Sequence, residues 1–339
     1  MFPLPVTFAV ILADLGPVEI AAWVFPPQRA AEPPLWLVCI PGGSYRGLAY
    51  YDRQVPGYPP DAYSMARFLA ARGIGLVVID NLGTGASSLV DVDGSRLTRD
   101  VYASAYGQLV ADLRASLVSG TLVSGLAPVD AERLYLVGVG HSMGGFLAVH
   151  TQAAQTCFDA LVLLGWPSAA ENVSGIPGID GDLPTLHQEW AKQADRGYLA
   201  LPHALLHPFF YSSSVPPELV AADSAEAVPI PVGLLEMMLP GVASDEAARL
   251  SCPLFLGFAE VDVTRTPRRD AAAYEAARSL TLFVQPSHHC TNFDATRLDL
   301  WREVAAWTRA RAVLARGPEA AAFPALASEE SAATQPLVV

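Results

Sequence analysis

Short runs of apolar residues alternate with helix-like segments through most of the chain, and this alternation restricts the possible folds more than any other feature. We interpret as strands the runs at residues 6–12, 18–24, 35–40, 74–80, 133–139, 160–165, 253–258 and 281–285. Apolar residues with helical spacing occupy 61–72, 100–118, 143–154, 268–279 and 294–314. The first two runs are separated only by a turn and are expected to be antiparallel. Strands separated by helices form parallel sheets, so we predict an α/β fold with an eight-stranded, mostly parallel sheet flanked by helices.

The alternation stops between residues 166 and 250, where the sequence is rich in proline and aromatic residues. We interpret residues 166–250 as a cap or lid inserted into a core formed by residues 1–165 and 251–314. Its aromatic and methionine side chains either line an apolar pocket or pack the cap onto the core. The last segment, residues 315–339, consists mainly of small and polar residues without periodicity, which predicts a flexible tail.

Composition and charge exclude several classes of function. A hydrophobic fraction of 52% supports a sizeable core, and a net charge of -13 would repel the phosphates of nucleic acids and anionic lipids. The four cysteines show no CxxC pair, so neither a disulfide framework nor a metal site is indicated. The N-terminus has no basic region before its apolar stretch, and no membrane-length apolar run occurs. We expect a cytoplasmic protein with no membrane span and no nucleic-acid partner. Its oligomeric state stays open, a homodimer included.

The strongest chemical signal is the sequence GHSMGG at residues 140–145, a G-x-S-x-G match between a predicted strand and a predicted helix. Glycines flank the serine because a sharp strand-to-helix turn brings backbone too close for a Cβ atom. Such a turn presents the hydroxyl of Ser142 above the sheet. We therefore predict that Ser142 is a nucleophile.

Two backbone amides are expected to stabilise the oxyanion that forms when Ser142 attacks a carbonyl. One is the amide of Met143, at the start of the predicted helix, where the helix dipole favours negative charge. The second comes from the loop PGGSYRG, which follows the strand at 35–40. We select the amide of Gly43 there, with that of Ser44 as the less favoured alternative.

A serine needs a histidine to accept its proton and a carboxylate to orient that histidine. Candidates for the acid are Glu260 and Asp262, which follow the strand at 253–258. Candidates for the base are His288 and His289, which follow the last predicted strand. The chain order serine, acid, histidine suits a serine hydrolase of this strand arrangement.

The GHSMGG motif, the PGGSY loop, the late acid and the late histidine together resemble the α/β-hydrolase superfamily over about residues 5–314. The resemblance implies an α/β-hydrolase fold and an active site made of the nucleophile Ser142, the acid Asp262, the base His289 and the oxyanion amides of Gly43 and Met143. Related hydrolases often show E-x-D-V and H-C-x-N-F patterns, which favours Asp262 over the alternative acid Glu260, and His289 over His288.

Two further segments bear on the resemblance. Residues 80–87 look like the D-x-x-G-x-G-x-S segment frequent in that superfamily, which is structural and carries no proton transfer. Pro41 stands where the superfamily usually has a histidine before the oxyanion-loop glycine, so the identity of the second donor is less fixed. The remaining histidines, including His141, His203 and His207, are expected to pack or to lie at the surface.

These observations predict a serine hydrolase that cleaves a carboxylic ester or lactone of a hydrophobic small molecule through an acyl-enzyme, with no cofactor and no metal ion. An acyltransferase, a thioesterase or a C-C bond hydrolase would use the same three residues. A cyclase or a ligand-binding protein could share the fold without using an acyl-enzyme.

Overall fold

The computed structural model describes residues 3–30, 32–168, 183–201 and 203–316. Eight strands form one sheet: β1 (Leu4–Leu12), β2 (Gly16–Phe25), β3 (Leu35–Ile40), β4 (Gly75–Ile79), β5 (Tyr135–His141), β6 (Ala160–Leu164), β9 (Leu254–Val261) and β10 (Leu280–His288). All eight strands were predicted from the apolar runs. Beyond Arg316, the predicted flexible tail lies outside the described residues.

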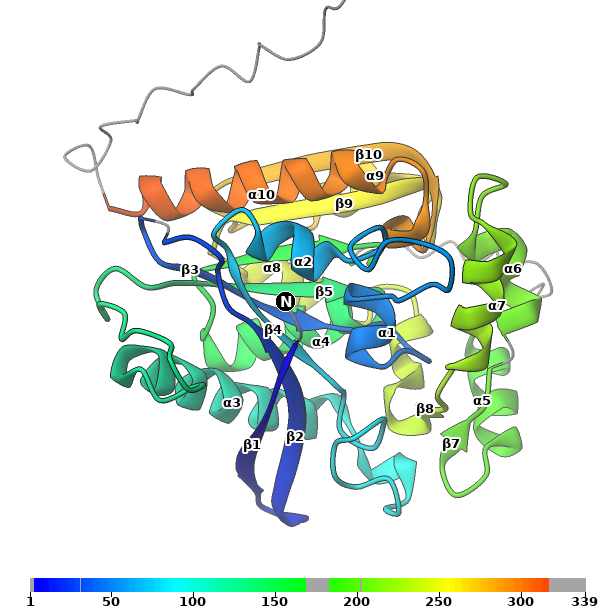
Figure 1. Ribbon diagram of the computed structural model, residues 1–339. Helices are drawn as coiled ribbons and strands as arrows, with labels where there is room; N and C mark the ends of the chain where they lie inside the picture. The colour runs from blue at the N-terminus through cyan, green and yellow to red at the C-terminus, as the bar shows by residue number, and fades with distance from the viewer. Residues whose placement is uncertain (1–2, 31, 169–182, 202, 317–339) are drawn as a thin grey trace, which may run out of the picture.

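The strand order is β1-β2-β4-β3-β5-β6-β9-β10, which confirms a mostly parallel sheet (Figure 1). The pairs β1–β2 and β2–β4 are antiparallel, whereas every pair from β4–β3 to β9–β10 is parallel. The central strands β3 to β6 are buried at every residue, because helices cover both faces. The carboxyl ends of β3, β5, β9 and β10 therefore meet at one edge of the sheet.

Alternate residues of each central strand pack into two separate cores. Leu35, Leu37 and Cys39 of β3 face α2 (Met65–Ala70) and α10 (Arg297–Leu314), whereas the side chains between them face the opposite layer. That layer contains α3 (Arg99–Ser119), α4 (Met143–Gln155) and α8 (Ser244–Arg249). Figure 1 shows α10 and α2 on one side of the sheet and α3 and α4 on the other.

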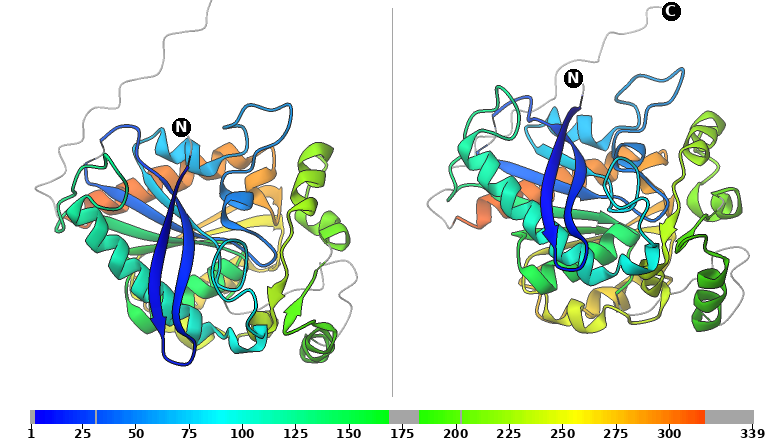
Figure 2. Two further views of the ribbon diagram at one scale, coloured as in Figure 1. Left: turned by 60° about the horizontal axis from the view of Figure 1, so that its bottom comes forward. Right: turned by 90° about the horizontal axis from the view of Figure 1, so that it is seen from below.

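The N-terminal hairpin of β1 and β2 extends from the sheet and packs along α3 (Figure 2). The Gln108 side chain of α3 pairs with both backbone groups of Ile11: its Nε2 donates to the Ile11 carbonyl at 2.9 Å, and its Oε1 accepts the Ile11 amide at 2.9 Å. This bidentate contact satisfies backbone groups at the open edge of β1.

The helices differ from the sequence prediction mainly at their ends. The helix predicted at 61–72 is shorter, because the Ser64 hydroxyl caps α2 by accepting the Arg67 amide at 3.0 Å. A short helix that was not predicted, α1 (Gly47–Tyr51), follows the glycine loop after β3. Helix α9 spans Pro267–Ala272 only, and α10 begins after a 3-10 turn at Thr291–Phe293. Apolar spacing does not mark such caps and turns.

Between β6 and β9 the chain forms small elements: α5 (Leu183–Gln193), β7 (Tyr198–Leu199), α6 (His203–Phe210), α7 (Pro217–Ala225), β8 (Ile230–Pro231), and the 3-10 helix Val232–Met238. We refer to residues 183–243 as the inserted segment. Both figures show α5, α6 and α7 together at the side where the loops after β3 and β10 lie. None of the helices in the described parts of the chain is both long enough and apolar enough to cross a bilayer.

Candidate active site

Ser142 is the single residue between the end of β5 and the start of α4. Its backbone has φ 51° and ψ -121°, a conformation that costs free energy for a residue with a Cβ atom. Two backbone hydrogen bonds hold it there: its amide donates to Leu164 at 2.8 Å, and its carbonyl accepts from Gly145 at 2.8 Å. The turn expected from the G-x-S-x-G motif is thus present, and it leaves the Ser142 side chain partly exposed.

Glycines are required on both sides of this turn by close packing. A Cβ atom on Gly140 would lie 2.2 Å from the Gly144 carbonyl oxygen. A Cβ atom on Gly144 would lie 2.2 Å from the carbonyl oxygen of Ile40, at the end of β3. Any side chain at these positions would push α4 away from β3 and would displace Ser142.

Asp262 and His289 come together at the carboxyl ends of β9 and β10. His289 Nδ1 lies 2.6 Å from Asp262 Oδ1, and both side chains are buried. The Asp262 carboxylate also accepts the amides of Val263 and Ala259, each at 2.8 Å. Three donors therefore fix the carboxylate, and the carboxylate in turn fixes the orientation of the imidazole.

The two alternative residues lie elsewhere. Glu260 is exposed on β9, and within the described residues it forms no hydrogen bond with either histidine. The His288 ring lies 3.1 Å from the Pro208 carbonyl oxygen, at the molecular surface. Adjacent residues of an extended chain point to opposite sides, which is why only one of the two histidines reaches Asp262.

The two amides expected to bind an oxyanion lie beside Ser142. A Cβ atom on Gly42 would lie 3.2 Å from Ser142 Cβ, and one on Gly43 would lie 3.7 Å from Met143 Sδ. The Gly43 amide forms no hydrogen bond within the described residues, and that of Met143, the first residue of α4, has no partner inside its helix. Both amides are therefore available to a ligand.

Residues of the D-x-x-G-x-G-x-S segment form hydrogen bonds with the oxyanion loop, residues 41–47. The Asp80 carboxylate accepts the amide of Gly47 at 2.7 Å and that of Ala86 at 2.8 Å. Asn81 Nδ2 donates to the carbonyl of Pro41 at 3.2 Å. The residue that replaces the usual histidine is thereby tied to the end of β4, and this segment has a supporting role.

An apolar pocket contains Ser142 and His289. Its volume is about 110 Å³, and its other side chains with a polar atom are those of Ser44, Trp166 and Trp190. None of the described lining residues is Asp, Glu, Lys or Arg. The inserted segment supplies the larger share of the lining: Trp190, Leu199, Leu201, Leu206, Phe209, Phe210, Ile230, Leu235, Met237 and Met238. The sequence left open whether such side chains line a pocket or pack the cap onto the core, and these ten line the pocket.

Two aromatic rings of α6 cover the imidazole of His289. Phe209 stacks on it at 4.9 Å between ring centroids, and Phe210 at 5.6 Å. The backbone carbonyl of Phe209 also accepts the His289 amide at 3.3 Å. The inserted segment therefore shields the His289–Asp262 pair from water, a contribution that no local motif in α6 indicated.

His141, directly before Ser142, connects the turn to the histidine loop. Its Nε2 lies 3.1 Å from the carbonyl oxygen of His289, and its ring stacks on Tyr50 at 4.1 Å. Burial, and then the neighbouring His289, hold the pKa of His141 well below its ordinary value. His141 is therefore neutral and donates its Nε2 proton to the carbonyl.

This depressed pKa predicts a loss of stability in mild acid. In the unfolded chain His141 takes up a proton near pH 6.5, whereas in the folded protein it stays neutral, so stability falls as the pH drops below 6.5. The contribution of one such residue is at most about 1.4 kcal/mol per pH unit. Urea unfolding at pH 7.5, 6.5 and 5.5 should show a shallower loss for His141→Asn than for the unmodified protein. Equal slopes would contradict the assignment.

Comparison with known proteins identifies the family. A model described as the alpha/beta hydrolase family matches residues 37–334, which is most of the chain. The chain belongs to the alpha/beta hydrolase family. Sequence comparison with curated proteins finds no match to this chain.

Solved structures with the same fold include hydrolases of several kinds. A thermophilic esterase from Thermogutta terrifontis is 14% identical, with a TM-score of 0.63 over 90% of this chain and 99% of that chain. A monoacylglycerol lipase from Paleococcus ferrophilus is 14% identical, with a TM-score of 0.56 over 92% and 100%. A proline iminopeptidase from Mycobacterium smegmatis is 15% identical, with a TM-score of 0.56 over 91% and 100%. At these identities the likeness establishes the alpha/beta hydrolase fold alone.

Proposed function

We propose that this alpha/beta hydrolase is a serine esterase or lactonase that cleaves neutral, hydrophobic small molecules through an acyl-enzyme. The observation that carries the proposal is one pocket lined both by a serine on a strained turn and by an imidazole paired with a buried carboxylate. A strained backbone at a partly exposed serine costs stability and is retained where the serine has a function. Two free amides at the same place suit a carbonyl that becomes an oxyanion.

In the first half of the proposed reaction, Ser142 Oγ attacks the carbonyl carbon and passes its proton to His289 Nε2. The carbonyl oxygen becomes negative and accepts hydrogen bonds from the amides of Met143 and Gly43. Asp262 stabilises the imidazolium through Nδ1. When the tetrahedral intermediate collapses, the bond to the alcohol oxygen breaks and the alcohol leaves with the proton from His289.

In the second half, a water molecule replaces the alcohol. His289 takes a proton from the water as the hydroxide forms a bond to the acyl carbon, and the same amides bind the oxyanion. Collapse breaks the bond to Ser142 Oγ, which regains its proton from His289, and the carboxylic acid is released. No cofactor enters either half.

The pocket lining supports a neutral substrate. A carboxylate, phosphate or ammonium group bound among the apolar side chains would lose its hydration without gaining an ionic partner, which costs several kcal/mol. A hydrocarbon group would instead gain from each methylene removed from water, by about 0.8 kcal/mol. We therefore assign the pocket to an alkyl or aromatic group of the ester.

Hydrolysis of matched p-nitrophenyl esters tests the proposal. We expect kcat/KM to rise from acetate to the chain length that fills the pocket and then to fall. A half-ester of a dicarboxylic acid of the same length, which ends in a carboxylate, should be at least about a hundredfold poorer. A folded protein that binds a neutral apolar ligand yet leaves every ester intact would contradict hydrolysis and favour a binding role.

A further inference from the structure

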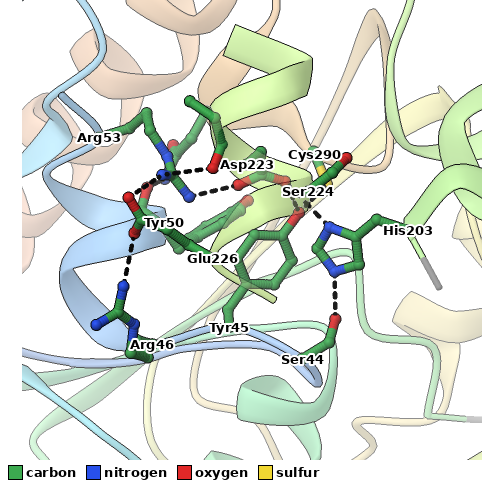
Figure 3. Close-up of polar contacts among 12 residues, drawn as sticks. Ser44, Tyr45, Arg46, Tyr50, Arg53, His203, Asp223, Ser224, Glu226 and Cys290 are labelled. Atoms are coloured by element: carbon green, nitrogen blue, oxygen red, sulfur yellow. Dashed lines mark hydrogen bonds and ion pairs between the residues drawn. The ribbon is translucent and has the colours of Figure 1, made fainter. Parts of the chain in front are cut away.

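A second buried polar cluster adjoins the Ser142 pocket, which it reaches only through Ser44. We call it the Asp223 cluster and define it as Ser44, Tyr45, Arg53, His203 and Asp223 (Figure 3). All five residues are at least nine-tenths buried. The first three belong to the core and the last two to the inserted segment, so the cluster joins the two parts.

The Asp223 carboxylate is the centre of this cluster. It accepts Arg53 Nη2 at 2.6 Å and the Tyr45 hydroxyl at 2.7 Å, and the Tyr211 hydroxyl also donates to it. Burial, and then the negative charge of Asp223, raise the pKa of Tyr45, so this phenol stays protonated and remains a donor. The carboxylate is thus held by one cation and two hydroxyl groups.

His203 lies between this carboxylate and the pocket. Its Nδ1 lies 3.4 Å from Asp223 Oδ2, and its Nε2 lies 2.7 Å from Ser44 Oγ. Ser44 follows Gly43 directly, lines the pocket, and has φ 63°, a left-handed conformation that a serine adopts at a cost. Its hydroxyl oxygen also lies 2.6 Å from the carbonyl oxygen of Gly43. The imidazole therefore fixes a strained residue next to a proposed oxyanion donor.

The same cluster reaches the loop that carries the proposed base. The Tyr45 hydroxyl lies 3.2 Å from Cys290 Sγ, and Cys290 follows His289. Burial, and then Asp223, raise the pKa of Cys290, so it is a neutral thiol and not a reactive thiolate. The Asp223 carboxylate is thus linked through His203 to Ser44 and through Tyr45 to Cys290, the residues that follow Gly43 and His289.

We infer that His203 and Asp223 are positioning residues, which use Ser44 to hold the oxyanion loop in the geometry that binds the transition state. This inference rests on the proposed function. A buried ionic network is weak as a source of stability, but it admits only one arrangement of the groups that it joins. An oxyanion amide must be placed to well within 1 Å to be effective, so a loop with a strained residue needs such a constraint.

The test combines Ser44→Ala, His203→Leu and the double variant. We expect each single variant to lower kcat by roughly tenfold to a hundredfold, because the loop geometry is lost, while KM changes by less than about threefold. The double variant should be no slower than the slower single variant, because both changes remove the same contact between His203 and Ser44. His203→Gln, whose amide can donate to Ser44, should recover part of the rate. The rate of Ser142 modification by a fluorophosphonate should follow the same order.

His207→Leu is the matched control. His207 lies on the same helix, and its side-chain contacts among the described residues are with the hydroxyl of Ser224, the residue after Asp223, at 2.9 Å and with the ring of Tyr211, not with the oxyanion loop. We expect wild-type kcat for this variant. Wild-type kcat in Ser44→Ala, or losses that multiply fully in the double variant, would overturn the inference. If His203→Leu does not fold, kcat of Ser44→Ala alone tests the inference. An unmodified protein that does not react with the probe would contradict the proposed function instead.

Discussion

Replacing Ser142 with alanine is expected to lower kcat by roughly a millionfold, to a residual rate that comes from binding and the oxyanion amides alone. Alanine has the same backbone cost as serine at φ 51°, so the strand-to-helix turn should persist. The change removes only the hydroxyl that we propose forms the acyl bond. Steady-state hydrolysis of a preferred p-nitrophenyl ester measures the loss.

Chemical labelling separates a lost nucleophile from a lost fold. A fluorophosphonate should modify the unmodified protein at one serine, and peptide mapping should place the adduct on Ser142. The Ser142→Ala variant should not be labelled, although its circular dichroism and melting temperature match those of the unmodified protein. Labelling at a different serine, or ester hydrolysis that survives in the variant, would exclude the acyl-enzyme on Ser142.

The second large effect is expected for Asp262→Asn, with a loss of about ten-thousandfold in kcat. An asparagine at this position presents an amide N–H to one of its present donors, His289 Nδ1 or the Ala259 amide. In the orientation that faces His289 Nδ1, the histidine favours the tautomer that carries its proton on Nε2, which cannot accept the proton of Ser142. Kinetics over a wide pH range would show the loss.

Glu260→Gln is the matched control, since it is the same carboxylate-to-amide change two residues earlier. Because Glu260 is exposed and Asp262, not Glu260, is the partner of His289 Nδ1, we expect kcat within about twofold of the unmodified protein. Should Glu260→Gln show the large loss and Asp262→Asn retain activity, the two acids would exchange roles. Comparable losses in both would instead indicate that the β9 loop rearranges.

The inserted segment has two kinds of contact with the proposed chemistry. Phe209 and Phe210 cover the imidazole, whereas His203 and Asp223 contact the oxyanion loop through polar groups. We propose that this segment is a cap that both shapes the pocket and orders the groups beneath it. An insertion of this kind can change substrate preference through its apolar lining while the β5, β9 and β10 loops stay unchanged.

Local sequence was sufficient for the strands of the sheet, though not for their order, and for the turn at Ser142. Eight apolar runs predicted the eight strands, and the central strands β3 to β6 are apolar along nearly their whole length because they are buried on both faces. Gly140 and Gly144 indicated the turn because a close backbone approach excludes a Cβ atom whatever the rest of the fold does. Helix ends were less certain, since a cap such as Ser64 is a single polar residue without periodicity.

Only the tertiary structure decided which distant side chains meet. The separation of Asp262 from Glu260 depends on how the β9 loop packs against the next strand, and residue type alone left both open. His203 was expected to be a packing or surface residue, yet it lies against Ser44, 159 positions away in the chain. Backbone conformation follows from neighbours in sequence, whereas a contact between an inserted helix and a core loop follows from the packing of whole elements, which no local pattern encodes.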